Sequence, residues 1–264
     1  MCIGAALIVV AIAATGITSA RQNTVAPGTG DFDIAALLRV DIPDETPEIK
    51  KEYTGFFVSF NPAHHLPNYV SWELTAAESR GEIPRTSQFR PDPDMYGCPT
   101  LDDYRHSGFD RGHMAPAGDM KWDRQAMLDS HYLTNICPQT HQLNGGRWST
   151  LENKCREWAA RDSAIVIIAG PILSDDMPRT IGDSQVSVPE RYFKVILAPF
   201  ANPPRAIGFI MPNSANIDGL ETLSIPVDRV EQITGFDFFA ALPDSLENAI
   251  ESRTNFRDWN RRKR

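Results

Sequence analysis

The sequence of 264 residues lacks the cysteine pattern of a structural metal site. Four cysteines are present, none of them in a CxxC pair, and Cys98, Cys137 and Cys155 lie far apart along the chain. Structural zinc sites usually take their ligands from closely spaced pairs of cysteine or histidine residues. The sequence therefore gives little support to a fold held together by zinc.

Charged side chains are absent from the first twenty residues. The apolar run from Ile3 to Ala14 is followed by small residues that end at Ala20, which is typical of a signal peptide. We expect residues 1–20 to be cleaved and the protein to be exported, either to a periplasm or to the medium. The alternative is an uncleaved membrane anchor, because about twenty uncharged residues suffice for one and no basic residue precedes the apolar run.

An oxidising compartment would allow a disulfide. Cleavage after residue 20 removes Cys2 and leaves an odd number of cysteines, so we expect one bridge and one free thiol. The sequence does not indicate which two of Cys98, Cys137 and Cys155 are joined.

An excess of positive charge is also missing, since the net charge is -8. Taken alone, this charge argues against a nucleic-acid partner. Binding a polyanion would require positive charge to be concentrated locally. One central stretch supplies it, with Arg85, Arg90, Arg105, Arg111, Lys121, Arg124, Arg147, Lys154 and Arg156.

No internal break divides the chain, and we predict one domain over residues 51–255, after a mobile lead-in at 21–50 that is rich in proline and glycine. A solvated basic tail at 256–264 would follow it.

Apolar residues at helical spacing predict a helix over 146–161. Aromatic and β-branched runs predict strands. The fold class is therefore α+β; we expect strands at 53–60, 69–74, 131–136, 164–169, 192–198 and 206–211, and further helices at 123–129, 227–234 and 245–252.

Four short motifs follow one another in the centre of the chain. They are Asp110-Arg111-Gly112-His113, Thr134-Asn135-Ile136-Cys137-Pro138-Gln139, Leu143-Asn144 and Leu151-Glu152. In this order and at these spacings they closely resemble the DNA/RNA non-specific endonucleases with the ββα-metal fold, a family that includes secreted sugar-nonspecific nucleases and endonuclease G. The similarity covers roughly residues 53–240. It implies a mixed or antiparallel central sheet flanked by helices, with the active site on a strand and a helix.

His113 and Asn144 are the residues to which the resemblance assigns the central chemistry. Cleaving a phosphodiester requires a deprotonated water, and an imidazole is largely neutral near pH 7 and accepts a proton. Mg²⁺ keeps several waters and takes few protein oxygens, so one amide oxygen is a reasonable ligand. The alternatives are a structural histidine and an asparagine that serves the turn before the helix.

The resemblance gives supporting roles to four other side chains. Arg111 and Arg85 match positions that contact phosphate, and a guanidinium group suits its oxygens; Arg90 or Arg105 could hold the place of Arg85. Glu152 would reach the waters of the metal. The alternative for Glu152 is an exposed pair with Arg156. Asn135 matches an active-site asparagine that steadies the metal or the phosphate, or else it is a polar residue at a strand end.

Two residues of the first motif would act without touching the substrate. Asp110 would orient the local backbone or a neighbouring side chain. Gly112 would allow a close approach of the chain where a Cβ atom would intrude.

The resemblance implies hydrolysis of DNA and RNA by a Mg²⁺-dependent endonuclease, with Mn²⁺ as a substitute, to give 5′-phosphate ends. Contacts would be to phosphate and sugar, which carry little sequence information. Two alternatives remain open: a nucleic-acid-binding protein on the same fold that has lost catalysis, and a nuclease toxin restricted to one partner. The sequence also leaves open whether the chain forms a homodimer.

Overall fold

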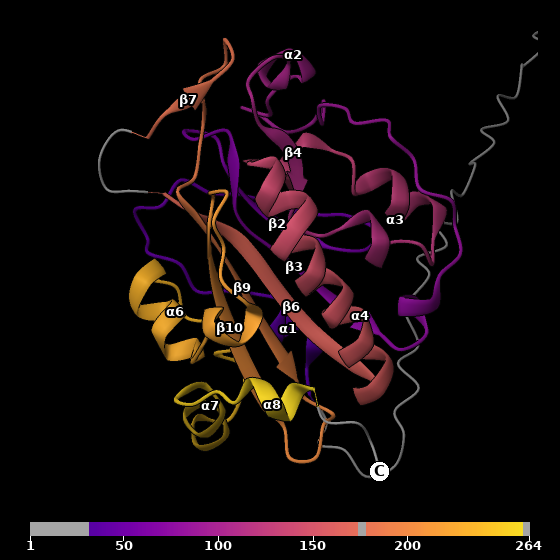
Figure 1. The fold of residues 1–264 in the computed structure, drawn as a ribbon, viewed down its shortest axis with the longest axis vertical. Coiled ribbons are helices and arrows are strands. Elements are labelled where there is room, and N and C mark those ends of the chain that lie inside the picture. The colour runs from indigo at the N-terminus through magenta and orange to yellow at the C-terminus, as the bar shows by residue number, and fades with distance from the viewer. Residues whose placement is uncertain (1–31, 174–177, 261–264) are drawn as a thin grey trace, which may run out of the picture. The chain divides into compact units, whose positions relative to one another are not determined.

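The centre of the computed structural model is a seven-stranded sheet in the order β1-β2-β3-β6-β9-β10-β11 (Figure 1). Residues 32–173 and 178–260 are described. Every neighbouring pair of strands in this sheet is antiparallel, which confirms the antiparallel form of the predicted sheet. The strands are β1 (Ile49–Glu52), β2 (Phe57–Asn61), β3 (Leu66–Thr75), β6 (Ala164–Ile172), β9 (Arg191–Ala198), β10 (Arg205–Pro212) and β11 (Ser224–Ile225).

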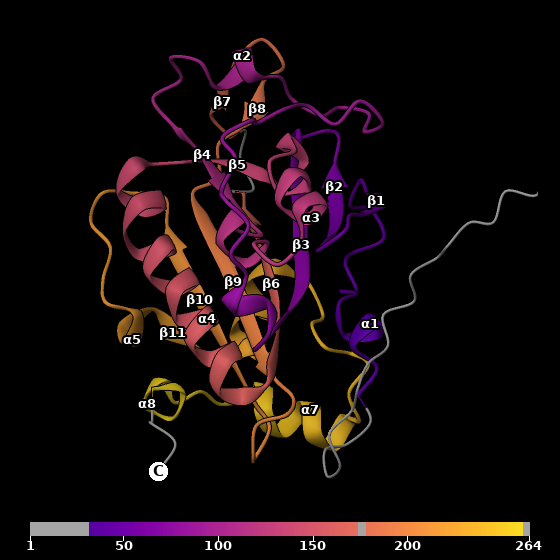
Figure 2. The same ribbon diagram turned by 90° about the vertical axis from the view of Figure 1, so that its right-hand side faces the viewer.

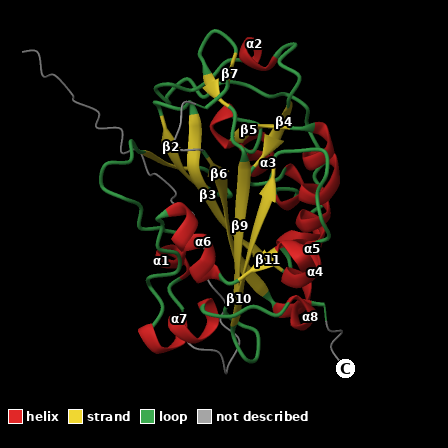
Figure 3. Ribbon diagram, turned by 60° about the vertical axis from the view of Figure 1, so that its left-hand side comes forward, coloured by secondary structure: helices red, strands yellow, loops and turns green. Residues whose placement is uncertain are grey.

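Helices cover both faces of this sheet, because its central strands are apolar on both sides. Along β6, Ile165 and Ile167 belong to one buried cluster, while Val166 and Ile168 belong to another. The first cluster is covered by α4 (Ser149–Asp162), and the second by α1 (Ile34–Leu37), α6 (Val227–Thr234) and α7 (Asp244–Glu251). Figures 2 and 3 show the sheet between these two layers.

The other elements are short. Two small antiparallel sheets pair β4 (Asp110–His113) with β5 (Ile136–Gln139) and β7 (Thr180–Ile181) with β8 (Val186–Ser187). The remaining α-helices are α2 (Leu101–Tyr104), α3 (Arg124–Asp129), α5 (Leu220–Leu223) and α8 (Phe256–Trp259). Single turns of 3₁₀-helix lie at Glu78–Arg80, Ala117–Asp119 and Leu133–Asn135, and a π-helical turn at Leu143–Trp148 precedes α4.

Both ends of the described chain are more ordered than predicted. In the expected lead-in, α1 buries Ile34 and Leu37 against the sheet, and β1 forms its edge. In the expected tail, Trp259 of α8 packs on Trp158 with 4.8 Å between ring centroids. Apolar side chains at these positions explain both differences. The predicted signal segment at 1–20 and the basic residues at 261–264 lie outside the described residues.

The predicted disulfide is absent from the described residues. Cys98, Cys137 and Cys155 are all free thiols. Cys137 on β5 and Cys155 on α4 are fully buried, where each serves as a small apolar side chain. Within 32–173 and 178–260, none of the helices combines the length and the hydrophobicity needed to cross a bilayer.

Candidate active site

The first part of the site is the hairpin of β4 and β5. The register pairs Gly112 with Cys137 and His113 with Ile136. A Cβ atom on Gly112 would lie 2.2 Å from Oε1 of the buried Gln139, so the expected close approach at this glycine is present. Because glycine has no Cβ atom, β4 and β5 can approach each other at residue 112, and this pairing sets the position of His113 at the end of β4.

The second part is the kinked turn that leads into α4. Gly146 interrupts the helical backbone with φ of -107° and ψ of -108°. Before this kink, Asn144 donates from Nδ2 to Oδ2 of Asp110 over 2.9 Å. The same carboxylate oxygen lies 3.0 Å from Nδ1 of His141. The hydrogen bond from Asn144 to Asp110 fixes the plane of the Asn144 amide. This agrees with the expectation that Asp110 orients a neighbouring side chain.

The third part is a pocket of about 590 Å³ that brings together Arg85, Arg111 and Asn144. Arg105 and Asp110 also line it. Arg90 instead stacks on the ring of Tyr132, 4.2 Å from its centroid, and does not line the pocket. Of the arginines considered for the phosphate contact, Arg85 and Arg105 are therefore placed beside Arg111.

His113 lies beside the pocket rather than among its lining residues. Its side chain is 6% exposed and packs on Phe89, which does line the pocket, with 5.2 Å between ring centroids. Burial, followed by the charges of His131, Arg85 and Arg111, holds the pKa of His113 well below its usual value. At neutral pH the imidazole is therefore uncharged, the form that accepts a proton.

Two contacts hold the end of β4 in place. Nε1 of Trp148, at the start of α4, donates to the carbonyl oxygen of His113 over 3.0 Å. The ring of His131 stands edge-on to the ring of His113 with 5.0 Å between centroids. Among the described residues, Nε2 of His113 is buried and has no hydrogen-bond partner.

The structure does not bring Asn135 to the pocket. Its side chain is fully buried, accepts from the backbone N–H of Ala115, and donates to the carbonyl oxygens of Ala115 and Ser130. These bonds use both amide hydrogens and the carbonyl oxygen of Asn135. The geometry therefore does not support the expected contact of Asn135 with metal or phosphate. Asn135 instead holds the backbone two residues beyond His113.

Replacing Asn135 with alanine is expected to destabilise the protein by about 2 kcal/mol or more, because three buried backbone groups lose their partner. Urea denaturation of the variant and the wild type measures this loss. A direct role in catalysis would instead give a variant of unchanged stability and low activity.

Glu152 lies on the first turns of α4, half-buried, near the buried side chains of Lys194 and Asp119. Burial is the main cause that raises its pKa to about 7, and Asp119 acts in the same direction, whereas Lys194 opposes the shift. Lys194 itself is fully buried against the Trp148 ring, with Nζ 4.2 Å from its centroid. The alternative for Glu152, an exposed pair with Arg156, is not among the ion pairs of the described residues, where Arg156 instead binds Asp119 over 2.6 Å.

The difference in stability between a Glu152→Gln variant and the wild type is expected to favour the variant more at about pH 8 than at about pH 5. The folded pKa of Glu152 lies above its ordinary value of 4.5, so its contribution to stability is present at low pH and lost as the pH rises through about 7. Glutamine does not titrate and escapes this loss. Thermal unfolding without divalent ions measures the difference; an equal effect of the substitution at both pH values would contradict the raised pKa.

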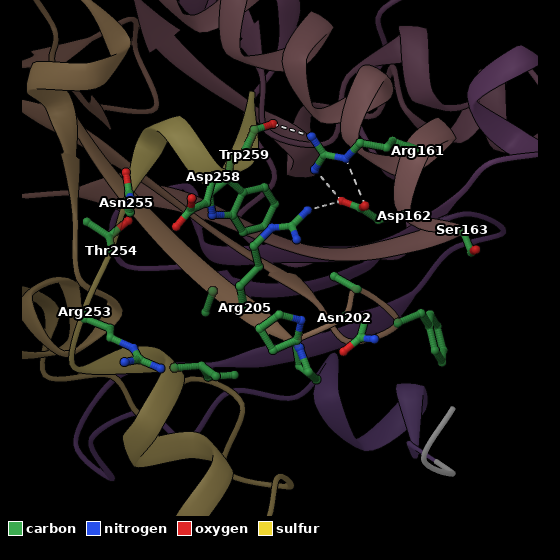
Figure 4. Close-up of a pocket in the computed structure, with 16 residues that line it drawn as sticks. Arg161, Asp162, Ser163, Asn202, Arg205, Arg253, Thr254, Asn255, Asp258 and Trp259 are labelled. Atoms are coloured by element: carbon green, nitrogen blue, oxygen red, sulfur yellow. Dashed lines mark hydrogen bonds and ion pairs between the residues drawn. The ribbon is translucent and has the colours of Figure 1, made fainter. Parts of the chain in front are cut away.

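A larger pocket of about 790 Å³ lies elsewhere, between the last turn of α4 and α8. Figure 4 shows Asp162 held by both Arg161 and Arg205, and Arg205 lies over the ring of Trp259. These charges are paired with one another, and none of the predicted site residues lines this pocket. We therefore take the smaller pocket, which Arg85, Arg111 and Asn144 line together, as the candidate active site.

Three residues that matter to this geometry were not singled out from the sequence: Phe89, His131 and Lys194. Phe89 and His131 come from segments distant from β4 and carry no motif. Lys194 left one signal, a charged residue inside the apolar run of β9, which is unusual for a buried strand.

The comparisons with known proteins identify the family of this chain. The family model described as "DNA/RNA non-specific endonuclease" matches residues 37–245. The mitochondrial nuclease EXOG of Danio rerio is 35% identical over 231 residues, which cover 81% of this chain and 67% of that protein. Human mitochondrial endonuclease G is 30% identical, with 75% and 71% covered. The chain spans only 56–58% of three further EXOG relatives.

A solved structure, the crystal structure of an EndoG/EndoGI complex, has the same fold. It superposes with a TM-score of 0.68 at 27% sequence identity and covers 74% of this chain and 86% of that chain. This match confirms the predicted fold class.

The expectation of an exported protein, periplasmic or secreted, is wrong. Relatives at 30–35% identity are named as mitochondrial nucleases, which points away from export.

The family model matches residues 37–245, and the relatives are named as nucleases, so the predicted class of enzyme, a hydrolytic endonuclease, is supported. The chain belongs to the DNA/RNA non-specific endonuclease family.

Proposed function

We propose that this chain hydrolyses the phosphodiester bonds of DNA and RNA with little sequence preference, with His113 as the general base and Asn144 as the ligand of one hydrated Mg²⁺. One observation carries this proposal. Arg85, Arg111 and Asn144 line a single pocket, and a neutral imidazole lies directly beside it.

The residues present fit the metal that the family implies. Nδ2 of Asn144 donates a hydrogen bond to Asp110, and this bond fixes the plane of the amide. Oδ1 of Asn144, which lines the pocket, is then left to serve as a metal ligand. A neutral oxygen is a suitable ligand for an ion that keeps most of its waters. When bound there, Mg²⁺ would supply positive charge beside the scissile phosphate, and Mn²⁺ would substitute for it.

Side chains in the pocket and beside it account for the remaining chemistry. His113 accepts the proton of the attacking water because its pKa is held low. Arg85 and Arg111 are exposed guanidinium groups that bind the non-bridging phosphate oxygens. Cleavage on the 3′-oxygen side of the phosphate leaves 5′-phosphate ends.

The lack of sequence preference follows from what the pocket offers. Arg85, Arg105 and Arg111 concentrate positive charge in a chain whose net charge is -8. Such contacts are made with phosphates, which repeat whatever the sequence. Binding should weaken as the salt concentration rises.

A digestion series tests the proposal. Single- and double-stranded DNA and RNA are incubated with the protein in Mg²⁺, in Mn²⁺ and in excess EDTA, and the EDTA sample is then supplied again with Mg²⁺. We expect cleavage of all four substrates, loss of activity in EDTA, and recovery on addition of the ion. Cutting that persists in EDTA would contradict the metal; binding without cutting in any divalent ion would favour a non-catalytic nucleic-acid-binding protein.

A further inference from the structure

A second cluster of acidic side chains lies away from the proposed active site, where α6 meets α7. Asp228 and Glu231 come from α6, and Glu251 is the last residue of α7. One carboxylate oxygen from each of the three lies within 4.8 Å of the other two. Figure 3 shows α6 and α7 on the sheet face opposite to α4, so this cluster is separate from the pocket at Asn144.

Glu251 gives the cluster an unsatisfied oxygen. Its side chain is 4% exposed, and Oε1 is buried without a hydrogen-bond partner among the described residues. Glu231, by contrast, has one oxygen that accepts from the backbone N–H of Phe238 over 2.9 Å. A buried carboxylate without a donor is costly unless it is protonated or binds a cation.

No basic side chain in the described part of the chain compensates for this charge. None of the ion pairs there includes Asp228, Glu231 or Glu251. The nearby titratable groups, Asp237 and Glu247, are acidic as well. Burial and then the charges of Glu231, Glu247, Asp228 and Asp237 raise the pKa of Glu251 to about 9.

We propose that Asp228, Glu231 and Glu251 bind a divalent cation, Ca²⁺ in the first place, at a structural site that links α6 to α7. Carboxylate oxygens are the ligands that Ca²⁺ prefers, and it accepts six to eight of them in irregular arrangements completed by water. Mg²⁺ fits less well, because it demands near-octahedral geometry and gives up its waters reluctantly. The cation supplies the positive charge that the surrounding side chains lack.

Such a site would join two segments that are distant in the chain. Asp228 and Glu231 lie before the loop at 235–243 and Glu251 lies after it. An ion bound to the folded state alone stabilises it by mass action.

Calorimetric titration with Ca²⁺ tests the proposal on chelator-treated protein. The Asn144→Ala variant serves as the starting protein, because it lacks the proposed ligand of the active-site metal. We expect one Ca²⁺ per chain and an increase in the unfolding temperature. Adding Asp228→Asn or Glu251→Gln should weaken binding roughly tenfold or more, since each removes a charged ligand.

Asp244→Asn is the matched control. Asp244 is an exposed carboxylate on α7, the helix of Glu251, and is not one of the three proposed ligands. It should bind Ca²⁺ as the starting protein does. Absence of binding by the Asn144→Ala protein would overturn the proposal, as would equal binding by the Asp228→Asn and Asp244→Asn variants. Glutamine resembles the protonated form of Glu251, so Glu251→Gln should fold without the ion and lose only its response to it.

Discussion

Replacing His113 with alanine should lower the single-turnover cleavage rate by roughly 10²- to 10⁴-fold, the usual contribution of a positioned general base. The variant loses the neutral imidazole that packs on Phe89 beside the pocket of Arg85 and Arg111. Its fold should survive, because the bond from Trp148 reaches the backbone carbonyl of residue 113 rather than the ring. Plasmid cleavage under enzyme excess measures the rate, and circular dichroism checks the fold.

His64→Ala is the control for this experiment. His64 is a half-buried histidine whose partner is Ser187, and it lines a different pocket. Its removal should leave the cleavage rate within a few-fold of the wild type. If the folded His113→Ala protein cleaves at a rate near that of the wild type, another group is the base.

Replacing Asn144 with alanine should lower the cleavage rate and raise the Mg²⁺ concentration needed for half-maximal activity. The substitution removes the only oxygen donor that we assign to the metal. Replacing Asp110 with alanine leaves that oxygen in place but frees its orientation, and should weaken the apparent Mg²⁺ affinity by about 10- to 100-fold, as is usual for a group that orients a ligand.

A Mg²⁺ titration of the cleavage rate separates these effects. Asn153→Ala is the control, since Asn153 is an exposed asparagine on α4 that bonds only within its own helix. It should show wild-type dependence on Mg²⁺. An Asn144→Ala protein with an unchanged Mg²⁺ requirement would remove Asn144 as the metal ligand.

Strands and helices with regular apolar spacing could be predicted from the sequence. The predicted helix at 227–234 coincides with α6, and the predicted strands at 164–169 and 192–198 lie within β6 and β9. These segments are buried along whole faces, so their composition reflects their surroundings. The motifs that hold Arg111, His113 and Asn144 lie in β4 and in the turn before α4, but the pairing of β4 with β5 was not predicted.

Elements shaped by side-chain bonds to the backbone could not be predicted in this way. The predicted strand at 131–136 is instead a 3₁₀ turn at Leu133–Asn135, and β5 starts only at Ile136. The buried amide of Asn135 binds backbone groups of Ala115 and Ser130, and this tertiary contact overrides the local preference for strand.

The roles of individual polar residues were equally hidden. Asn135 was expected at the phosphate because of its place in the motif, but its hydrogen bonds are all made with the backbone. His131 has no motif around it, yet its ring contacts His113. Such roles depend on which segments the fold brings together, and spacing along one segment carries no information about them.

The titration of the His113 imidazole tests the central claim most directly. Nitrogen-15 NMR of histidine-labelled protein, with His113→Ala used to assign the signal, follows the ring nitrogens as the pH is lowered. We expect the ring to remain neutral well below pH 6.5, because burial and the nearby charges of His131, Arg85 and Arg111 oppose its protonation. A ring that is already protonated at neutral pH could not accept a proton from water, and that result would contradict the proposed base.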